Sequence, residues 1–191
     1  MTNLEFKARV ENFDRARKVL RQRQAYFAGV LEQSDTYFHA QNGRLKLREI
    51  QRRSPATKGF MVESQLIFYQ RADAVAIKRS DYFIAKLEAA ENMRAVLAAA
   101  LGIKIVVTKT RELFLLGYGG AATEKNKIHI RVHLDRVEEL GEFVEIEALA
   151  GENISAARAE QEAQNLREAF AISPADLVAG SYSDLLAEKH L

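Results

Sequence analysis

The stretch from Lys127 to Ala148 constrains the fold more than any other part of the chain, because it reads as two β-strands joined by a tight turn. In its first half, the apolar residues Ile128, Ile130, Val132 and Leu134 alternate with the polar residues His129, Arg131, His133 and Asp135. Its second half alternates in the same way, with Val144 and Ile146 set against Phe143, Glu145 and Glu147. A period of two is typical of strands. The stretch therefore predicts a hairpin with one apolar and one charged face, a pattern that is also common in sheets with one side open to water.

The same alternation recurs in three other segments, each with ionic residues on one face. These residues are Glu5, Lys7 and Arg9 in the first segment, Arg44, Lys46 and Arg48 in the second, and Lys109 and Arg111 in the third. If the strands close into a barrel with their apolar faces packed outward against helices, the ionic faces line its interior, because successive side chains point to opposite sides. Unpaired buried charges are costly. We therefore expect a bound anion and metal, or a wide water-filled lumen, inside the barrel.

Turn and capping signals place the other elements. Beyond the hairpin, strands are predicted over residues 3–10, 26–40, 44–50, 61–71, 82–87 and 104–116. Asn12 is expected to cap a helix that buries Leu20. A second helix, closed by Gly102, carries an apolar stripe that we expect to face the core, made of Met93, Val96, Leu97, Ala100 and Leu101. Further helices are expected near Ser155, Ser173 and Ser181. This pattern favours an α+β fold, a mainly antiparallel closed β-barrel of about eight strands with flanking helices.

Length and composition narrow the class of protein. The chain has 191 residues, two prolines and no repeat, so we expect one domain over residues 1–191. The absence of cysteine excludes disulfides and thiolate metal sites and fits a reducing cytoplasm. No export signal or membrane-length apolar run is present, so a cytoplasmic protein without a membrane partner is expected. A net charge of +2 gives little support for nucleic-acid binding, and no such partner is expected.

The charged strand faces would bring two kinds of side chain into one interior. The acids are Glu5, Asp135, Glu145 and Glu147, and the bases are Lys7, Lys46, Arg48, Arg71, Lys109, Arg111 and Arg131. Carboxylate oxygens are the ligands that Mg²⁺ or Mn²⁺ prefers, and substrate phosphates and water commonly complete the shell. Guanidinium and ammonium groups would neutralise the remaining phosphate oxygens. With the turn centred on Glu138–Glu139, Asp135 and Glu145 are diagonal neighbours about 7–8 Å apart at the backbone, with room for a cation between them.

His129 and His133 do not fit a zinc pair. Four strand residues span about 13 Å, which is too far for two ligands of one ion. Both histidines are expected to be strand-face residues or outer-shell contacts of a metal site.

Short motifs follow one another along nearly the whole chain. They are Asn3-Leu4-Glu5-Phe6-Lys7, QSDTYF at 33–38, Lys46 with Arg48, Lys109-Thr110-Arg111, Asp135, Glu145-Ile146-Glu147 and SYSDLL at 181–186. In this order they resemble the Glu-x-Glu-x-Lys signature, second strand, paired basic positions, Lys-x-Arg, lone aspartate, Glu-x-Glu and C-terminal tail of the CYTH superfamily. These triphosphate tunnel metalloenzymes include class IV adenylate cyclases, thiamine triphosphatases and inorganic triphosphatases.

The resemblance implies a metal-dependent triphosphatase that acts in a charged β-barrel tunnel. Its substrate would be inorganic triphosphate, thiamine triphosphate or ATP, and its cofactor Mg²⁺ or Mn²⁺. Carried over by motif, the catalytic residues would be Lys7 and Arg111. Substrate would be bound by Lys46, Arg48, Arg71, Lys109 and Arg131, and the metal by Glu5, Asp135, Glu145 and Glu147.

Two departures from the family pattern keep other functions open. Asn3 replaces the first glutamate of the signature, and Tyr69-Gln70-Arg71 stands where the family often has Lys-Gly-Pro. The first alternative is a class IV adenylate cyclase that makes cyclic AMP from ATP. The second is a non-catalytic module that binds triphosphate or polyphosphate. A homodimer is also open to the chain.

Overall fold

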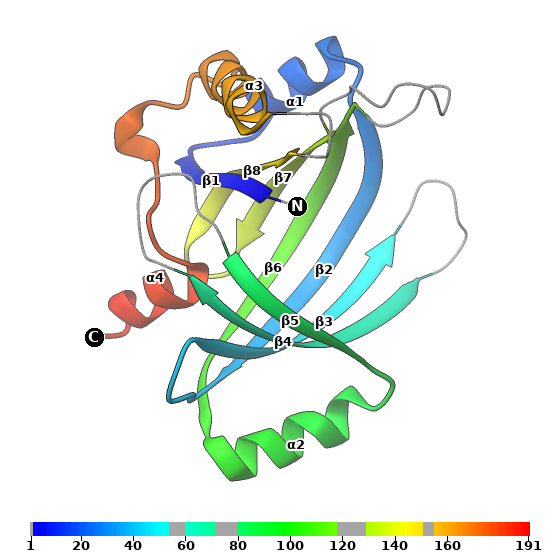
Figure 1. Ribbon diagram of the computed structural model, residues 1–191, viewed down its shortest axis with the longest axis vertical. Helices are drawn as coiled ribbons and strands as arrows, with labels where there is room; N and C mark the ends of the chain where they lie inside the picture. Colours follow the sequence, from blue (N-terminus) through cyan, green and yellow to red (C-terminus); the bar gives the residue numbers. More distant parts are fainter. Residues whose placement is uncertain (1, 54–59, 72–79, 118–128, 151–154) are drawn as a thin grey trace.

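One curved antiparallel sheet dominates the structure. The computed structural model describes residues 2–53, 60–71, 80–117, 129–150 and 155–191, with the backbone alone for residues 2–4, 71, 80–82, 149–150 and 156. Within these ranges, eight strands follow the order β1-β8-β7-β6-β2-β3-β4-β5. The strands are β1 (Thr2–Val10), β2 (Tyr26–Phe38), β3 (Arg44–Arg53), β4 (Met61–Arg71), β5 (Ser80–Leu87), β6 (Ile103–Leu116), β7 (His129–Val137) and β8 (Gly141–Ala150). Figure 1 shows the strong curvature that gives the sheet a concave and a convex face. The α+β class is confirmed.

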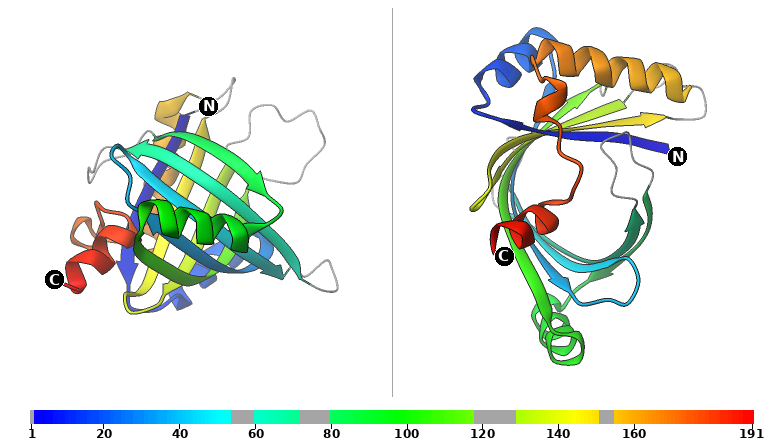
Figure 2. Two further views of the ribbon diagram at one scale, coloured as in Figure 1. Left: turned by 90° about the horizontal axis from the view of Figure 1, so that it is seen from below. Right: turned by 90° about the vertical axis from the view of Figure 1, so that its left-hand side faces the viewer.

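Four α-helices and a 3-10 turn accompany the sheet in the described ranges. They are α1 (Asp14–Gln22), α2 (Ala90–Leu101), α3 (Ala156–Ala169), η1 (Pro174–Asp176) and α4 (Tyr182–Lys189). Figure 2 shows α1 and α3 together on the convex side near β1 and β8, α2 at the far end of the molecule, and α4 at one end of the curved sheet. None of these helices combines the length and apolar character needed to cross a membrane.

The main hydrophobic core lies between α1, α3 and the convex face of β1, β7 and β8. Ile130, Val132 and Leu134 of β7 and Val144 and Ile146 of β8 are buried in it, as their alternation predicts. They pack with side chains of the two helices that include Ala16, Leu20, Ala163 and Leu166. Each large apolar side chain buried in this way stabilises the fold by about 1.5–3 kcal/mol. Because side chains alternate along a strand, this packing directs the ionic residues of β7 and β8 to the concave face.

The β7–β8 hairpin has a slightly different register from the predicted one. Val137 pairs with Gly141, so the turn comprises residues 138–140 and is centred on Glu139. Glu139 has a φ of 63° and Gly141 a φ of 97°, both in the left-handed region. Glycine occupies that region without a steric penalty, which suits the start of β8. In this register Asp135 lies directly opposite Phe143.

Closure of the sheet into a barrel by hydrogen bonds is not confirmed. Among the described residues, β1 and β5 are the two edges of the sheet and do not pair with each other. The free side of β1 is instead occupied by the segment after η1. The backbone N–H of Val178 donates to the carbonyl of Lys7 (2.9 Å), and Ala8 forms an antiparallel bridge with Leu177. At Lys7 and Ala8 this segment therefore lies where a barrel-closing strand would pair with β1.

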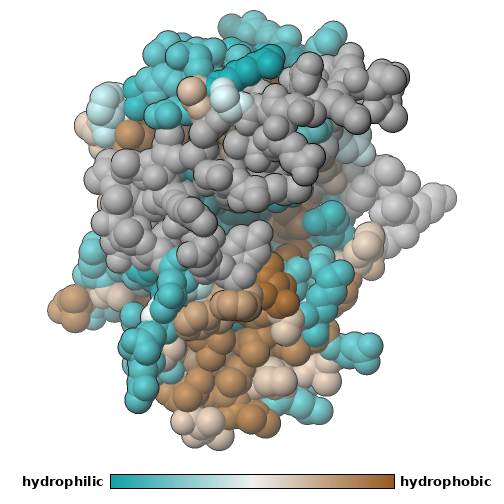
Figure 3. Space-filling model, viewed as in Figure 1, coloured by the Kyte–Doolittle hydropathy of each residue, from teal (hydrophilic) through white to brown (hydrophobic). Residues whose placement is uncertain are grey.

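The expectation that the stripe of α2 faces the core is wrong. No residue of α2 is buried, Val96 is 63% exposed and Leu101 is 39% exposed. The helix connects the edge strand β5 to β6 and lies at the far end of the molecule, where its main contacts with the sheet are to β2 and β3. Its apolar side chains therefore contribute to a hydrophobic surface there (Figure 3). Helical periodicity identified the helix correctly. It could not show whether the apolar stripe would be buried by another part of the chain or left exposed.

Replacing Val96 by glutamine is expected to change the free energy of unfolding by less than about 0.5 kcal/mol, because the side chain is mostly exposed. Replacing Leu166 by alanine, by contrast, should cost about 2–5 kcal/mol, because Leu166 is fully buried. Urea unfolding of both variants measures the difference. A large loss in the Val96 variant would show that α2 is covered in solution.

Candidate functional site

The concave face of the sheet contains a charged cavity of about 290 Å³. Among the residues that the structure describes, six cationic side chains line it, namely Lys7, Lys46, Arg48, Lys109, Arg111 and Arg131. Four carboxylates line it as well, namely Glu5, Asp35, Glu145 and Glu147. The excess of cations favours an anionic ligand.

Asp35 of β2 forms the centre of the first ionic cluster. It lies directly opposite Arg48 of β3, whose Nε and Nη2 atoms donate to its two carboxylate oxygens at 2.7 and 2.8 Å. Lys46 Nζ donates to the same carboxylate at 2.7 Å and to the hydroxyl of Tyr37 at 3.3 Å. Burial alone would raise the pKa of the Asp35 carboxyl, but the charges of Arg48 and Lys46 outweigh burial and hold the pKa below its ordinary value. Asp35 therefore remains an anion that fixes the two cations in place.

Asp135 of β7 forms a second cluster of the same design. It lies opposite Arg111 of β6, whose Nε and Nη2 atoms donate to it at 2.6 and 2.7 Å, and Lys109 Nζ donates at 2.9 Å. The hydroxyl of Tyr182 donates to it at 2.9 Å. Burial opposes ionisation of Asp135, but Arg111 and Lys109 lower its pKa below the ordinary value. Each cluster thus combines a Lys-x-Arg pair with one aspartate on the neighbouring strand, and it carries one net positive charge when its lysine is protonated.

The pKa values of the two cluster lysines, Lys46 and Lys109, lie near neutral pH. Burial and the neighbouring charge of Arg48 lower the pKa of Lys46 to about 7, although Asp35 opposes the shift. Burial and the charge of Arg111 lower the pKa of Lys109 to about 8. A bound anion would favour the charged form of both ammonium groups. The cavity is therefore expected to take up protons when it binds an anion near neutral pH.

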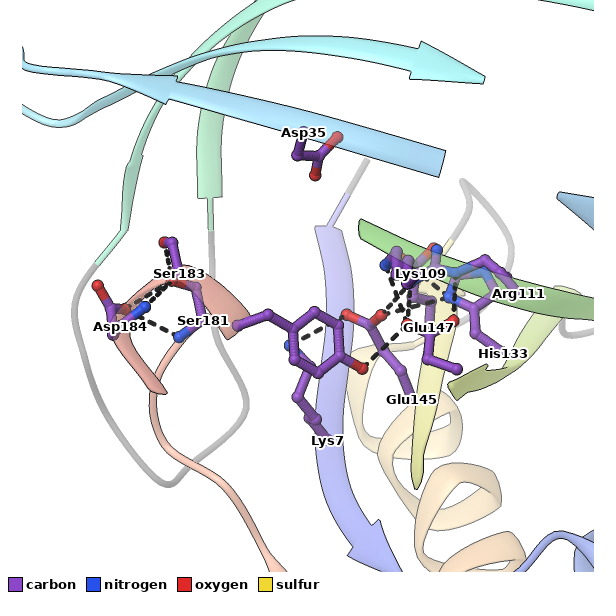
Figure 4. Close-up of polar contacts among 12 residues, drawn as sticks. Lys7, Asp35, Lys109, Arg111, His133, Glu145, Glu147, Ser181, Ser183 and Asp184 are labelled. Atoms are coloured by element: carbon purple, nitrogen blue, oxygen red, sulfur yellow. Dashed lines mark hydrogen bonds and ion pairs between the residues drawn. The ribbon is translucent and has the colours of Figure 1, made fainter. Parts of the chain in front are cut away.

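Three residues of β7 and β8 form a group with the composition of a metal site. His133 lies opposite Glu145, and Glu147 lies two residues further along β8. Nδ1 of His133 is 3.5 Å from Glu145 Oε2 and 3.9 Å from Glu147 Oε1. Glu5 of β1 lies opposite Glu147 in the β1–β8 ladder and lines the same cavity. Figure 4 shows this group beside Lys109 and Arg111, with Asp35 on a separate strand.

The first turn of α4 completes this end of the site. Ser181 and Asp184 form a capping box, and Asp184 also accepts from Arg44 Nη2 of β3 at 2.9 Å. This anchoring places the ring of Tyr182 next to Lys7, whose Nζ lies 4.1 Å from the ring centroid. The ring also packs edge-on against Phe143, with centroids 5.0 Å apart. Tyr182 therefore joins the charged cavity to the apolar cluster beneath α4.

The structure places most of the sequence-predicted site residues on this cavity. Lys7 and Arg111 converge on Glu145, at 3.8 Å from Oε1 and 2.6 Å from Oε2 respectively. Arg131 lies at the rim, with its side chain 46% exposed and 3.7 Å from Glu147. The side chains of Arg71 and Asn3 lie outside the described part of the structure.

The arrangement around Asp135 differs from the predicted one. The guanidinium of Arg111 bridges Asp135 and Glu145, in the space where we expected a cation. Asp135 has no exposed surface and does not line the cavity, so a metal ion there would have to displace Arg111 or Lys109. The carboxylate acts in this structure as the counter-ion of its cluster.

Sequence reasoning missed Asp35, Tyr182 and the closeness of His133 to the two glutamates. Asp35 and Tyr182 lie within QSDTYF and SYSDLL, motifs used only to recognise the family. His133 was considered only with His129, along one strand. Its position opposite Glu145 depends on the register of β7 against β8.

Comparison with known proteins identifies relatives of this fold. The CYTH domain family model matches residues 1–182. The PH1012 protein of Pyrococcus horikoshii OT3 is 20% identical, with a TM-score of 0.71 over 96% of this chain and 98% of that chain. A Vibrio parahaemolyticus protein described as a candidate adenylate cyclase is 21% identical, with a TM-score of 0.67 over 98% of each chain. The Hippeastrum protein HpAC1, a candidate adenylyl cyclase described as having a dominant triphosphatase activity, is 8% identical, with a TM-score of 0.61 over 98% of this chain and 95% of that chain. No curated protein matches the chain.

Proposed function

The chain belongs to the CYTH family, and from this premise we propose that it is a metal-dependent triphosphatase that hydrolyses inorganic or organic triphosphates. The observation that carries the proposal is that one cavity holds both an excess of fixed cations and a group of carboxylates suited to a metal. The cations suit the phosphate oxygens of a triphosphate, and the carboxylates suit the divalent cation that accompanies it.

The donor set fits a divalent metal. Glu145 and Glu147 offer carboxylate oxygens on one strand, and Glu5 lies opposite Glu147 on the next. We propose these three residues as the metal ligands, with Mg²⁺ or Mn²⁺ as the ion. When bound, such an ion supplies positive charge that polarises phosphate oxygens. Asp135 is better suited to hold Lys109 and Arg111 in place than to bind the metal, because its oxygens already accept from both cations and from Tyr182.

The chain's own residues would act by positioning the triphosphate and neutralising its charge. Lys46 and Arg48 come from β3 and Lys109 and Arg111 from β6, on either side of β2, and all four line the cavity, so a chain of phosphates could contact both pairs. Lys7 approaches Glu145 and is placed to contact phosphate oxygens near the carboxylates. Hydrolysis adds water to the terminal phosphorus and breaks its bond to the bridging oxygen, which releases phosphate. Such a reaction needs little covalent chemistry from the protein, because positioning and charge neutralisation supply most of the catalysis.

An adenylate cyclase is the second candidate. One part of the cavity wall is formed by Tyr37, Ile67, Tyr69 and Ile84, which could pack against a nucleotide base. The cyclase reaction would use the same cations, but a ribose hydroxyl would attack the α-phosphorus and expel pyrophosphate.

A substrate panel separates these functions. Inorganic triphosphate, thiamine triphosphate and ATP would each be incubated with the protein and Mg²⁺ or Mn²⁺, and all products identified by phosphorus NMR and chromatography. Release of terminal phosphate supports the triphosphatase. Formation of cyclic AMP and pyrophosphate would instead support the adenylate cyclase and reject the triphosphatase. Binding without any product would indicate a non-catalytic triphosphate-binding module.

Triphosphate binding in the absence of metal is expected to take up protons and to weaken as the pH rises through about 7, the pKa of Lys46. Protons are taken up because the pKa of Lys46 is lowered in the unliganded protein and is raised again by a bound anion. Isothermal titration calorimetry at pH 7.5, in two buffers that differ in ionisation enthalpy, measures the uptake. Lys46→Arg is the matched control, because its guanidinium stays charged. Equal proton uptake by wild type and this variant would contradict the prediction.

A further inference from the structure

His133 is a nitrogen donor placed among carboxylates. Its side chain is buried, and the residue is 4% exposed. One ligand atom from each of His133, Glu145 and Glu147 can be chosen so that all three atoms lie within 4.8 Å of one another. Within the described part of the chain, no other set of three histidine or acidic residues meets this condition.

The separations are those of ligands around a single ion. Metal–nitrogen and metal–oxygen bonds are about 2.0–2.2 Å long, so two ligands at right angles lie about 3 Å apart and two opposite ligands about 4 Å apart. The distances from His133 Nδ1 to Glu145 and Glu147, 3.5 and 3.9 Å, fall between these limits. One ion can therefore contact all three residues after small side-chain movements.

Glu145 and His133 also lie next to the fixed cations of the cavity. The carboxylate of Glu145 contacts Arg111 Nη2 at 2.6 Å and Lys7 Nζ at 3.8 Å. An imidazole binds a metal ion through the lone pair of one ring nitrogen.

We propose that His133 is a direct ligand of the metal ion held by Glu145 and Glu147, and that it makes the site select transition-metal ions over Mg²⁺. The inference rests on the proposed function for the role of the two glutamates as metal ligands. Mg²⁺ prefers oxygen ligands and ideal octahedral geometry, whereas first-row transition-metal ions accept imidazole, with affinity rising from Mn²⁺ to Co²⁺. A site that adds one imidazole to the proposed carboxylate ligands therefore binds Co²⁺ and Mn²⁺ more tightly than Mg²⁺.

Pulsed EPR of the wild-type protein loaded with Mn²⁺ tests the ligand directly. We expect the electron spin echo of Mn²⁺ to be modulated by a coordinated imidazole nitrogen. This modulation should change when the protein is labelled with ¹⁵N-histidine. The modulation should disappear in His133→Gln. It should persist in His129→Gln, the matched control four residues earlier on β7. Absence of the modulation in wild type, or its persistence in His133→Gln, would overturn the proposal without depending on how well the variant folds.

Calorimetric titration with Mg²⁺, Mn²⁺ and Co²⁺ alone tests the selectivity. His133→Gln should weaken Co²⁺ binding by about 10–100-fold and Mg²⁺ binding by less than about threefold, because only the transition metal gains from the nitrogen. Equal losses for both ions, or no binding of Co²⁺ to wild type, would overturn the proposal. Neither experiment contains substrate. A protein that coordinates metal through His133 but hydrolyses no triphosphate would refute the proposed function alone, and an active enzyme without nitrogen coordination would refute this inference alone.

Discussion

Replacing Glu147 by glutamine is expected to lower metal-dependent hydrolysis of triphosphate by about 100-fold or more, since loss of a direct ligand should exceed the effect of losing an outer-shell partner. The amide keeps the shape of the side chain but removes its negative charge, so it holds a hard divalent cation poorly. Glu147 suits this test better than Glu145, because its closest ionic contacts are weak: Arg131 at 3.7 Å and His133 at 3.9 Å. The fold should therefore survive, as circular dichroism and urea unfolding would show.

Glu142→Gln is the matched control for this prediction. Glu142 lies on the same strand but pairs with Arg136 and does not line the cavity. Its replacement should leave the rate and the metal dependence unchanged. If Glu147→Gln retained wild-type activity with the same metal dependence, Glu147 could not be a metal ligand.

Replacing Asp135 by asparagine is expected to destabilise the fold by about 3–5 kcal/mol, because it leaves two buried cations without their counter-ion. Lys109 and Arg111 are 4% and 8% exposed, and both donate to this carboxylate. Asp14→Asn, which removes a highly exposed carboxylate on α1, is the control and should change little. Urea unfolding at pH 7 measures both variants.

The loss of stability in Asp135→Asn should depend on pH in a defined direction. The folded-state pKa of Asp135 is lowered, so its contribution to stability is present above its unfolded value of about 3.9 and disappears as the pH falls through the folded value. The gap between wild type and Asp135→Asn should therefore shrink in acid. Triphosphate should stabilise the variant more than wild type, since it supplies negative charge to the same cations. A loss below about 1 kcal/mol at pH 7 would show that Asp135 is not required to balance them.

The strands were predictable because their signals are local. Period-two alternation and turn residues identified all eight strands, including β3 after Asn42-Gly43, where Gly43 has a φ of 67°. The edges of the sheet were not predictable in the same way. Which segment occupies the free side of β1 depends on Leu177 and Val178, about 170 residues further along the chain, and no local pattern encodes that contact.

The charged residues of the site were predictable from the phase of each strand, but their pairing was not. Alternation put Lys46, Arg48, Lys109 and Arg111 on one face without showing that Asp35 and Asp135 lie opposite the two arginines. Those contacts follow from the registers of β2 against β3 and of β6 against β7. The same limit applies to His133, whose neighbours are on β8. The sequence thus indicated which charged residues share a face, whereas the partners of those residues on neighbouring strands became clear only from the registers.

The aspartates of the two ionic clusters also bear on how fast products could leave. Six cations in one cavity, without internal counter-ions, would hold a polyphosphate so tightly that release would limit the rate of turnover. Asp35 and Asp135 each offset one of these charges permanently, whether the cavity is filled or empty. If the protein cleaves a triphosphate as proposed, each fragment carries less charge than the whole and competes less well with these fixed carboxylates. The same ion pairs that hold the cations in position would thus help to expel the products.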